Sequence, residues 1–225
     1  MTSASLRPQD WTVDPLPSHL TSFAHGLVAE DSGTWRPLRQ HWRGDTPETG
    51  FQASSARIFW TATALHYEVV LHGAGQHNTA RQLNELTWDL GDVCEIFLCD
   101  VATRSYIELH VTPENHRLQL HFPFGAIDLV RAGNARIEDY MVRDPNWVET
   151  TVQRAENAIA VRVIIPAAIF TRHRAIDADS EVRTAVCRYD YRGRPGRPLL
   201  SSTAPLSGPS FHAPDEWARL IFHRA

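Results

Sequence analysis

Short runs of residues typical of β-strands recur along this 225-residue chain, and they constrain its fold more than any other feature. Turn-forming Gly, Pro, Asn and Asp separate the runs. The runs span residues 56–63, 64–73, 92–100, 104–113, 117–124, 146–155, 158–166, 182–191 and 217–223. No segment of similar length has the periodicity of an amphipathic helix, and only two short helical turns are predicted, after Pro166 and around residues 79–85.

Regularly spaced short strands without intervening helices favour a β-sandwich over parallel βαβ units. A chain of this length can bury one self-sufficient core. We therefore predict an all-β, single-domain, mainly antiparallel β-sandwich over residues 1–225. Its core is expected at about residues 20–223, with residues 1–19 as an N-terminal extension.

Composition and charge exclude several classes of partner. The formal net charge is −4 and the chain contains no Lys, so the sequence predicts no nucleic acid or anionic membrane as a partner. No apolar run is long enough to span a bilayer, and residues 1–11 lack an apolar signal core, so a cytoplasmic location is expected. Its three cysteines, Cys94, Cys99 and Cys187, are predicted to be reduced and structural. The sequence does not specify an oligomeric state.

Glu95 interrupts an otherwise apolar strand, DVCEIFLCD at residues 92–100. Because side chains alternate across a strand, the core-facing set is Cys94, Ile96 and Leu98, and the opposite set is Val93, Glu95, Phe97 and Cys99. An unpaired buried carboxylate is costly, so Glu95 is expected to face solvent, a cation or a ligand. Arg188 in a neighbouring strand is a candidate partner, and a purely structural ion pair is the simplest alternative.

Residues 105–122 predict a β-hairpin that turns at residues 112–116, where Pro113 and Asn115 suit a tight turn. Alternation predicts an apolar core face with Ile107, Leu109, Val111, Leu118, Leu120 and Phe122. The other face is then polar and aromatic, with Tyr106, Glu108, His110, Gln119 and His121. On this reading His110 and His121 are neighbours.

Several motifs follow one another in a distinctive order along residues 20–223. They are Trp88 with Gly-Asp-Val-x-Glu-Ile-Phe-Leu at 91–98, Tyr-x-Glu-x-x-Val-x-Pro at 106–113, Ile-Pro at 165–166, Arg-Tyr-Asp at 188–190 and Phe-His-x-Pro-x-x-Trp-x-x-Leu-x-Phe at 211–222. This order resembles that of the family-nine carbohydrate-binding modules, bacterial-type modules within the DOMON-like group of β-sandwiches. The resemblance implies a jelly-roll-like sandwich that binds a sugar in a surface cleft without transforming it.

The resemblance also implies which residues would bind the sugar. A pyranose has an apolar C–H face that stacks on an aromatic ring, and hydroxyls that suit charged partners. Trp88 resembles a stacking ring, whereas Glu95 and Arg188 resemble groups that bind hydroxyls. Asp89 and Asp92 are neighbouring candidates, and Phe211, next to His212, is the nearest counterpart of a second stacking ring.

Metal and haem binding are the alternatives from a different functional class. The chain has 12 histidines, and His110 and His121 could bind zinc together with Glu108, although no His-x-His or His-Glu-x-x-His spacing is present. Some DOMON-like relatives bind haem through Met and His, which here would require Met141 with His110 or His121. The sequence favours neither cofactor and leaves calcium open.

Enzyme function has one candidate pair of residues. Glu95 and Glu108 could act as paired carboxylates in glycoside hydrolysis, which requires a defined separation and one raised pKa. No nucleophile elbow, phosphate-binding loop or dinucleotide fingerprint is present in the sequence. Non-catalytic sugar binding is therefore the favoured function, and a role as an accessory or interaction domain of a glycan-active enzyme stays open.

Overall fold

The computed structural model describes residues 10–15, 34–171, 175–177, 179–191 and 196–222, and it confirms the all-β class. The strands are β1 (Trp11–Pro15), β2 (Arg36–Leu38), β3 (Ser54–Thr61), β4 (Ala64–His72), β5 (Val93–Asp100), β6 (Tyr106–Val111), β7 (Arg117–Phe122), β8 (Glu149–Ala155), β9 (Ala158–Pro166), β10 (Val182–Asp190), β11 (Leu199–Ser202) and β12 (Ala218–Phe222). The helical segments are η2 (His41–Arg43), η3 (Thr87–Asp89), α1 (Ala126–Arg131), η4 (Ile137–Tyr140) and η5 (Ala167–Ile169). Every predicted strand is observed, and the predicted turn after Pro166 is η5.

The differences from prediction are short elements. Strands β1, β2 and β11 and helix α1 were not predicted, because each is too short to show a clear hydrophobic period. The helical turn predicted around residues 79–85 is wrong, since these residues form non-helical turns and η3 follows them.

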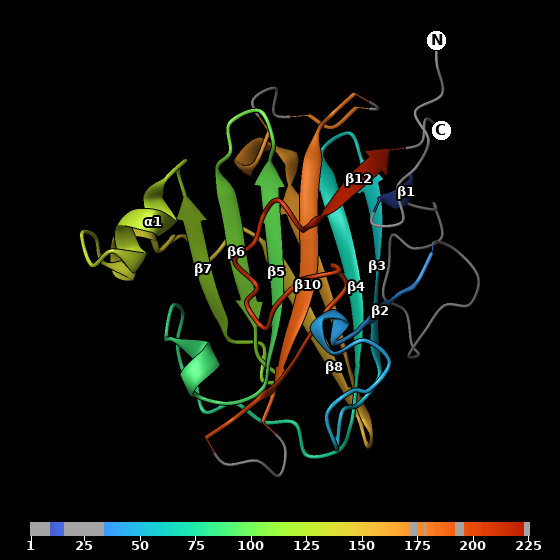
Figure 1. Cartoon of the computed structure of the whole chain (residues 1–225). Helices are drawn as coiled ribbons and strands as arrows, with labels where there is room; N and C mark the ends of the chain where they lie inside the picture. Colours follow the sequence, from blue (N-terminus) through green and yellow to red (C-terminus); the bar gives the residue numbers. More distant parts are fainter. Residues whose placement is uncertain (1–9, 16–33, 172–174, 178, 192–195, 223–225) are drawn as a thin grey trace.

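The strands form one curled sheet in the order β7-β6-β5-β10-β12-β1-β3-β4-β9-β8, with β11 beside β10 and β2 beside β3. We call β5, β6, β7, β10 and β11 the front sheet, and β2, β3, β4, β8 and β9 the back sheet; Figure 1 shows one in front of the other. The main apolar core lies between them. Tyr67 of β4 and Thr184 of β10 share a buried hydrogen bond across this core, with 3.0 Å between their hydroxyl oxygens.

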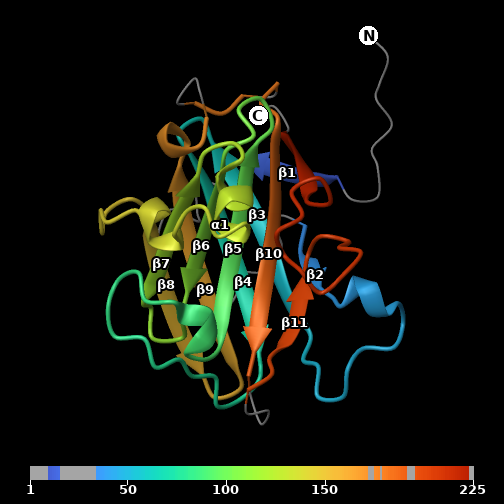
Figure 2. The ribbon, with the colours of Figure 1, turned by 60° about the vertical axis from the view of Figure 1, so that its left-hand side comes forward.

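The front sheet is covered on both faces. Its outer face carries a second apolar cluster, which includes Phe97, Leu120 and Phe122. Residues from α1, η4 and the segment leading into β12, among them Phe211 and Trp217, pack onto this cluster. Figure 2 shows β11 beside β10, on the side away from β7. Polar side chains on this outer face are therefore enclosed.

Strand β1 corrects the predicted N-terminal boundary. Within the predicted extension, Trp11 and Val13 are fully buried core residues. β1 pairs in parallel with β12 and, through its last residues, with β3, so it joins the two sheets. The core thus includes part of residues 1–19, because two apolar side chains on one face of a short strand suffice to bury it.

The predicted hairpin is confirmed, but the faces assigned to its second strand are wrong. Val111 pairs with Arg117, and Tyr106 pairs with Phe122. Directly paired residues point to the same face, so the outer face carries Tyr106, Glu108, His110, Leu118, Leu120 and Phe122, whereas Gln119 and His121 lie on the inner face. Apolar residues occur on both faces of the buried front sheet, so alternation alone did not indicate which face was which.

Two further expectations have a structural outcome. The three cysteines are free and buried, as predicted. Among the described residues, no helix has the length and apolar character needed to cross a membrane.

We expect Trp11→Ala to lower the free energy of unfolding by about 3–5 kcal/mol, because it leaves a large cavity between the sheets. Thr12→Ala, at a half-buried position of the same strand, is the matched control and should cost less than about 1 kcal/mol. Urea unfolding measures both. Equal effects of the two substitutions would contradict the placement of β1 in the core.

Candidate functional site

A cluster of buried titratable side chains lies on the outer face of the front sheet. Glu95 of β5 pairs in register with His110 of β6, and Glu108 is two residues from His110 on the same face. The Nδ1 atom of His110 lies 3.4 Å from Glu95 Oε1, and its Nε2 atom lies 2.9 Å from Glu108 Oε1. The exposed fractions of all three residues are 3% or less. Both carboxylates therefore contact one imidazole.

Two further groups complete this cluster. The Thr87 hydroxyl oxygen lies 2.8 Å from His110 Nδ1. On the other side, the ring of His212 is about one-third exposed, and its Nδ1 atom lies 3.5 Å from Glu108 Oε2. We call Glu95, Glu108, His110 and His212 the carboxylate–histidine cluster.

Burial determines how this cluster holds protons. Burial raises the pKa of Glu95 to about 8, against the opposing effect of His110 and with a further increase from Glu108. Burial lowers the pKa of His110, but Glu95 and Glu108 raise it by more, so the net change is upward. Glu95 and His110 therefore retain between them a proton that the unfolded chain releases.

Aromatic rings border the cluster. Trp88 meets the edge of the His110 ring, with 5.5 Å between the ring centroids. Tyr191 donates its hydroxyl hydrogen to the Trp88 carbonyl and stacks on Tyr189, with a centroid distance of 6.4 Å. Trp88, Tyr189 and Tyr191 are half-buried, so each ring has a surface that a ligand can contact. The site thus combines exposed aromatic surface with enclosed charge.

The segment between β4 and β5 positions Trp88. Its two ends come together at an isolated bridge between Asn78 and Gly91. Gly91 has a φ of 139°, and a Cβ atom there would collide with the backbone at His77. The buried Asn78 side chain donates to the carbonyls of Thr87 and Asp92 at 2.8 and 3.1 Å. These bonds fix the start of η3, which carries Trp88.

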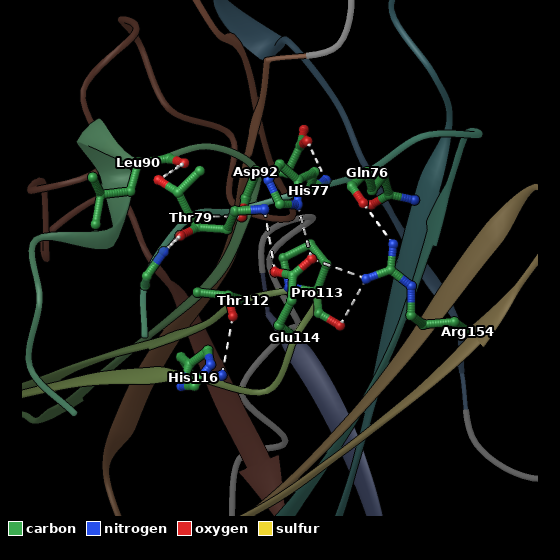
Figure 3. A network of polar contacts seen from close by, with 12 residues as sticks. Gln76, His77, Thr79, Leu90, Asp92, Thr112, Pro113, Glu114, His116 and Arg154 are labelled. Atoms are coloured by element: carbon green, nitrogen blue, oxygen red, sulfur yellow. Dashed lines mark hydrogen bonds and ion pairs between the residues drawn. The ribbon is translucent and has the colours of Figure 1, made fainter. Parts of the chain in front are cut away.

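A polar network connects this segment to the two sheets (Figure 3). Arg154 of β8 donates to the Gln76 carbonyl at 2.7 Å and to Glu114 Oε1 at 3.0 Å. Glu114, in the β6–β7 turn, accepts a bond from the Asn78 backbone N–H at 3.1 Å. The segment that carries Trp88 is therefore bound to the back sheet and to the hairpin turn.

Asp92 and Asp89 occupy different environments. Asp92 is buried and accepts bonds from the backbone N–H groups of His77 and Tyr191, each at 2.9 Å. Its side chain thereby connects the Trp88 segment to Tyr191, the residue that follows β10. Asp89 is exposed, in the same helical turn as Trp88.

Arg188 does not lie beside Glu95. It pairs with Cys94, so its side chain points to the inner face, and Glu95 points to the outer face. There Arg188 donates to Ser54 Oγ at 2.9 Å and to the His72 carbonyl at 3.0 Å, and its Nη2 atom lies 3.2 Å from Asp190. The predicted Glu95–Arg188 pair is therefore wrong, and the side chain that faces Glu95 is His110.

Phe211 is buried and packs edge-on against Phe97 and Tyr189, with centroid distances of 6.1 and 5.4 Å. Phe211 thus packs over the outer face, and Tyr189 and Tyr191 supply the half-buried rings near Trp88. The sequence did not indicate these two tyrosines. They lie two and four residues after Cys187, which pairs with Glu95, so they share its face. The strand register was the signal needed to find them.

The structure shows where the residues considered for metal and haem binding lie. His121 lies on the inner face near Trp147, so it does not meet His110 as predicted. Met141 packs against the outer-face cluster and so does not share a face with His121. Within the described ranges, no group of three or more His, Cys, Asp or Glu has an arrangement suited to a metal ion.

The arrangement of strands is a curled β-sandwich, and solved structures share this fold. A family-nine module from Caldicellulosiruptor kristjanssonii in complex with cellotriose matches with a TM-score of 0.64 and 11% identity, covering 95% of this chain and 93% of the module. A family-nine module from the same organism in complex with glucose matches with a TM-score of 0.58 and 10% identity, covering 95% of this chain and 97% of the module.

A protein from Bacteroides uniformis that is provisionally assigned as carbohydrate-binding matches with a TM-score of 0.61 and 17% identity, covering 85% of this chain and 87% of that protein. No family model and no curated protein matches the sequence. At these identities the likeness shows the fold, and it confirms the family-nine-like sandwich that the sequence motifs predicted.

The retained proton predicts a pH-dependent stability. Both shifts are upward, so the folded state binds more protons than the unfolded state, and stability falls as the pH rises from about 4.5, the ordinary pKa of a glutamate, through about 8, the raised pKa of Glu95. Each retained proton contributes up to about 1.4 kcal/mol per pH unit to the slope. Glu95→Gln should flatten this slope when urea unfolding is measured across the range. An unchanged slope in the variant would contradict the shared proton.

Glu114→Gln should loosen the Trp88 segment, because it weakens the bonds to Arg154 and Asn78. We expect amide hydrogen exchange to accelerate about fivefold in residues 77–92, corresponding to about 1 kcal/mol of local stability. Glu149→Gln, an exposed change on β8, is the control and should leave these rates unchanged. Equal rates in the two variants would show that the network does not hold the segment.

Proposed function

We propose that this protein binds a carbohydrate at the carboxylate–histidine cluster and the rings beside it, and that it does not transform the sugar. The observation that carries the proposal is the position of half-exposed Trp88, whose ring meets the buried His110–Glu95 pair on a family-nine-like fold. A sugar stacked on Trp88 would place its hydroxyl edge toward Glu95 and His110.

The chemistry of the cluster suits hydroxyl groups. A carboxylate accepts hydrogen bonds, and an imidazole can donate or accept them, so the pair can orient both ends of a hydroxyl. Contacts among Glu95, His110, Glu108 and Thr87 hold these groups in place before a ligand arrives. A preorganised site loses less side-chain entropy on binding.

Similar structures support the choice of ligand class. The modules from Caldicellulosiruptor kristjanssonii were solved with cellotriose and with glucose. Cellotriose and its monomer, glucose, are therefore the first ligands to test. The proposal excludes the paired-carboxylate hydrolysis considered from the sequence, and it requires no metal or haem.

The test is a calorimetric titration with cellotriose and glucose in the presence of EDTA. We expect binding by the wild-type protein and a loss of about tenfold in affinity for both Trp88→Ala and Glu95→Gln, through lost stacking and a lost charged hydrogen bond. Cellotriose should be recovered intact after incubation.

Trp147→Ala is the matched control for Trp88→Ala. Trp147 packs near His121, toward the core between the sheets, so its removal should leave sugar affinity unchanged. Circular dichroism verifies that each variant is folded. Absence of binding by the wild-type protein at millimolar sugar would contradict the proposal, as would full affinity in Trp88→Ala.

A further inference from the structure

A separate pocket of about 200 Å³ opens on the same face of the front sheet, at the end where β6 begins and β7 finishes. Tyr106, His212 and Phe124 are among the residues that line it. Tyr106 and His110 lie on the same face of β6, and the strand rise places them roughly 13 Å apart. The pocket therefore lies away from Glu95 and His110 along the same strand, and it shares His212 with the carboxylate–histidine cluster.

The pocket has an excess of positive charge. Arg104, Arg131 and Arg183 line it, together with the two carboxylates of Asp128 and Asp215. The Nη1 atom of Arg131 lies 3.8 Å from Asp128 Oδ1, and the Nη1 atom of Arg183 lies 3.8 Å from Asp215 Oδ1. Both aspartates are largely exposed, so they stand at the rim. Three guanidinium groups against two carboxylates leave one positive charge, in a chain whose net charge is −4.

Arg104 supplies the charge that is not balanced. Its guanidinium lies over the ring of Phe124, 4.6 Å from the centroid, and it has no carboxylate partner among the described residues. Arg104 also has a φ of 55°, a left-handed conformation that is unfavourable for a residue with a long side chain. Its N–H bonds to the Asp100 carbonyl at 2.8 Å, which holds this conformation. Glycine would be less strained here, so the Arg104 side chain is present at a cost in backbone strain.

Phe124 supplies an aromatic surface beside this charge. Its ring is 64% exposed, which is unusual for a large apolar side chain in the described part of the chain. An exposed ring suits the apolar face of a sugar, and a guanidinium suits a carboxylate. The pocket is smaller than the roughly 300–1,000 Å³ of sites for drug-sized ligands, so one sugar ring is an appropriate occupant.

We propose that this pocket binds a hexuronate unit, with the sugar ring on Phe124 and the carboxylate on Arg104. The inference extends the proposed function, because it assumes a carbohydrate ligand, and it identifies that ligand as an acidic one. His212 connects the two sites, since it lines the pocket and its Nδ1 atom lies 3.5 Å from Glu108 of the cluster. An acidic oligosaccharide could then occupy the cluster with one unit and the pocket with its uronate.

The experiment compares calorimetric titrations of D-glucuronate and D-glucose into the wild-type protein and two variants. Arg104→Gln removes the charge, and Arg104→Gly also relieves the left-handed backbone. We expect glucuronate to bind wild-type protein about tenfold more tightly than glucose. Both variants should lose this preference and keep their glucose affinity, and Arg104→Gly should unfold at the same or a higher urea concentration.

Arg136→Gln is the matched control, since it removes the same charge from an exposed residue paired with Glu138 outside the pocket. It should retain the glucuronate preference. Equal affinity of the wild-type protein for the two sugars would overturn the pocket inference and leave the proposed function standing. A preference that survives in both Arg104 variants would also overturn it. Glucuronate binding without glucose binding would support the pocket and contradict the cluster as the neutral-sugar site, and binding of neither sugar would refute both.

Discussion

The burial of the front sheet on both faces is the constraint on which the rest of this structure depends. Its inner face packs against the back sheet, and its outer face is covered by α1, η4 and the segment that leads into β12. A polar side chain on either face is then removed from water and requires a partner. Glu95 has His110 on the outer face, and Arg188 has Ser54, a backbone carbonyl and Asp190 on the inner face.

The surroundings of Glu95 and of Arg188 differ in whether a ligand can contact them. Arg188 joins β10 to the back sheet, and its bonds are used within the core. The carboxylate–histidine cluster is enclosed too, but half-exposed Trp88 lies against its histidine, and Tyr191 is bonded to Trp88. Desolvation strengthens each interaction inside such a cluster and keeps a proton in it near neutral pH. Charge that is held in place behind aromatic surface is suited to recognition of a polar, ring-shaped ligand.

Much of the fold was predictable, because strand position depends on local composition and alternation. The two faces of the strand with Glu95 were assigned correctly, since its core face carries only apolar residues. The strand after the hairpin turn was sorted wrongly, because its two faces are nearly equally buried and the turn alone sets its register. The motif resemblance selected Trp88, Glu95 and Arg188. The structure places Trp88 and Glu95 around His110, whereas one step of alternation places Arg188 on the other face.

The sequence by itself determined where the strands lie, which residues of β5 face outward, and that Glu95 needs a partner. Each of these follows from the two-residue period of a strand and the cost of burying charge. Only the tertiary structure decided that the partner is His110, that Tyr189 and Tyr191 border the site, and that Arg104 and Phe124 line one pocket. Those outcomes depend on register and on loops that meet across long sequence separations, which a local period does not encode.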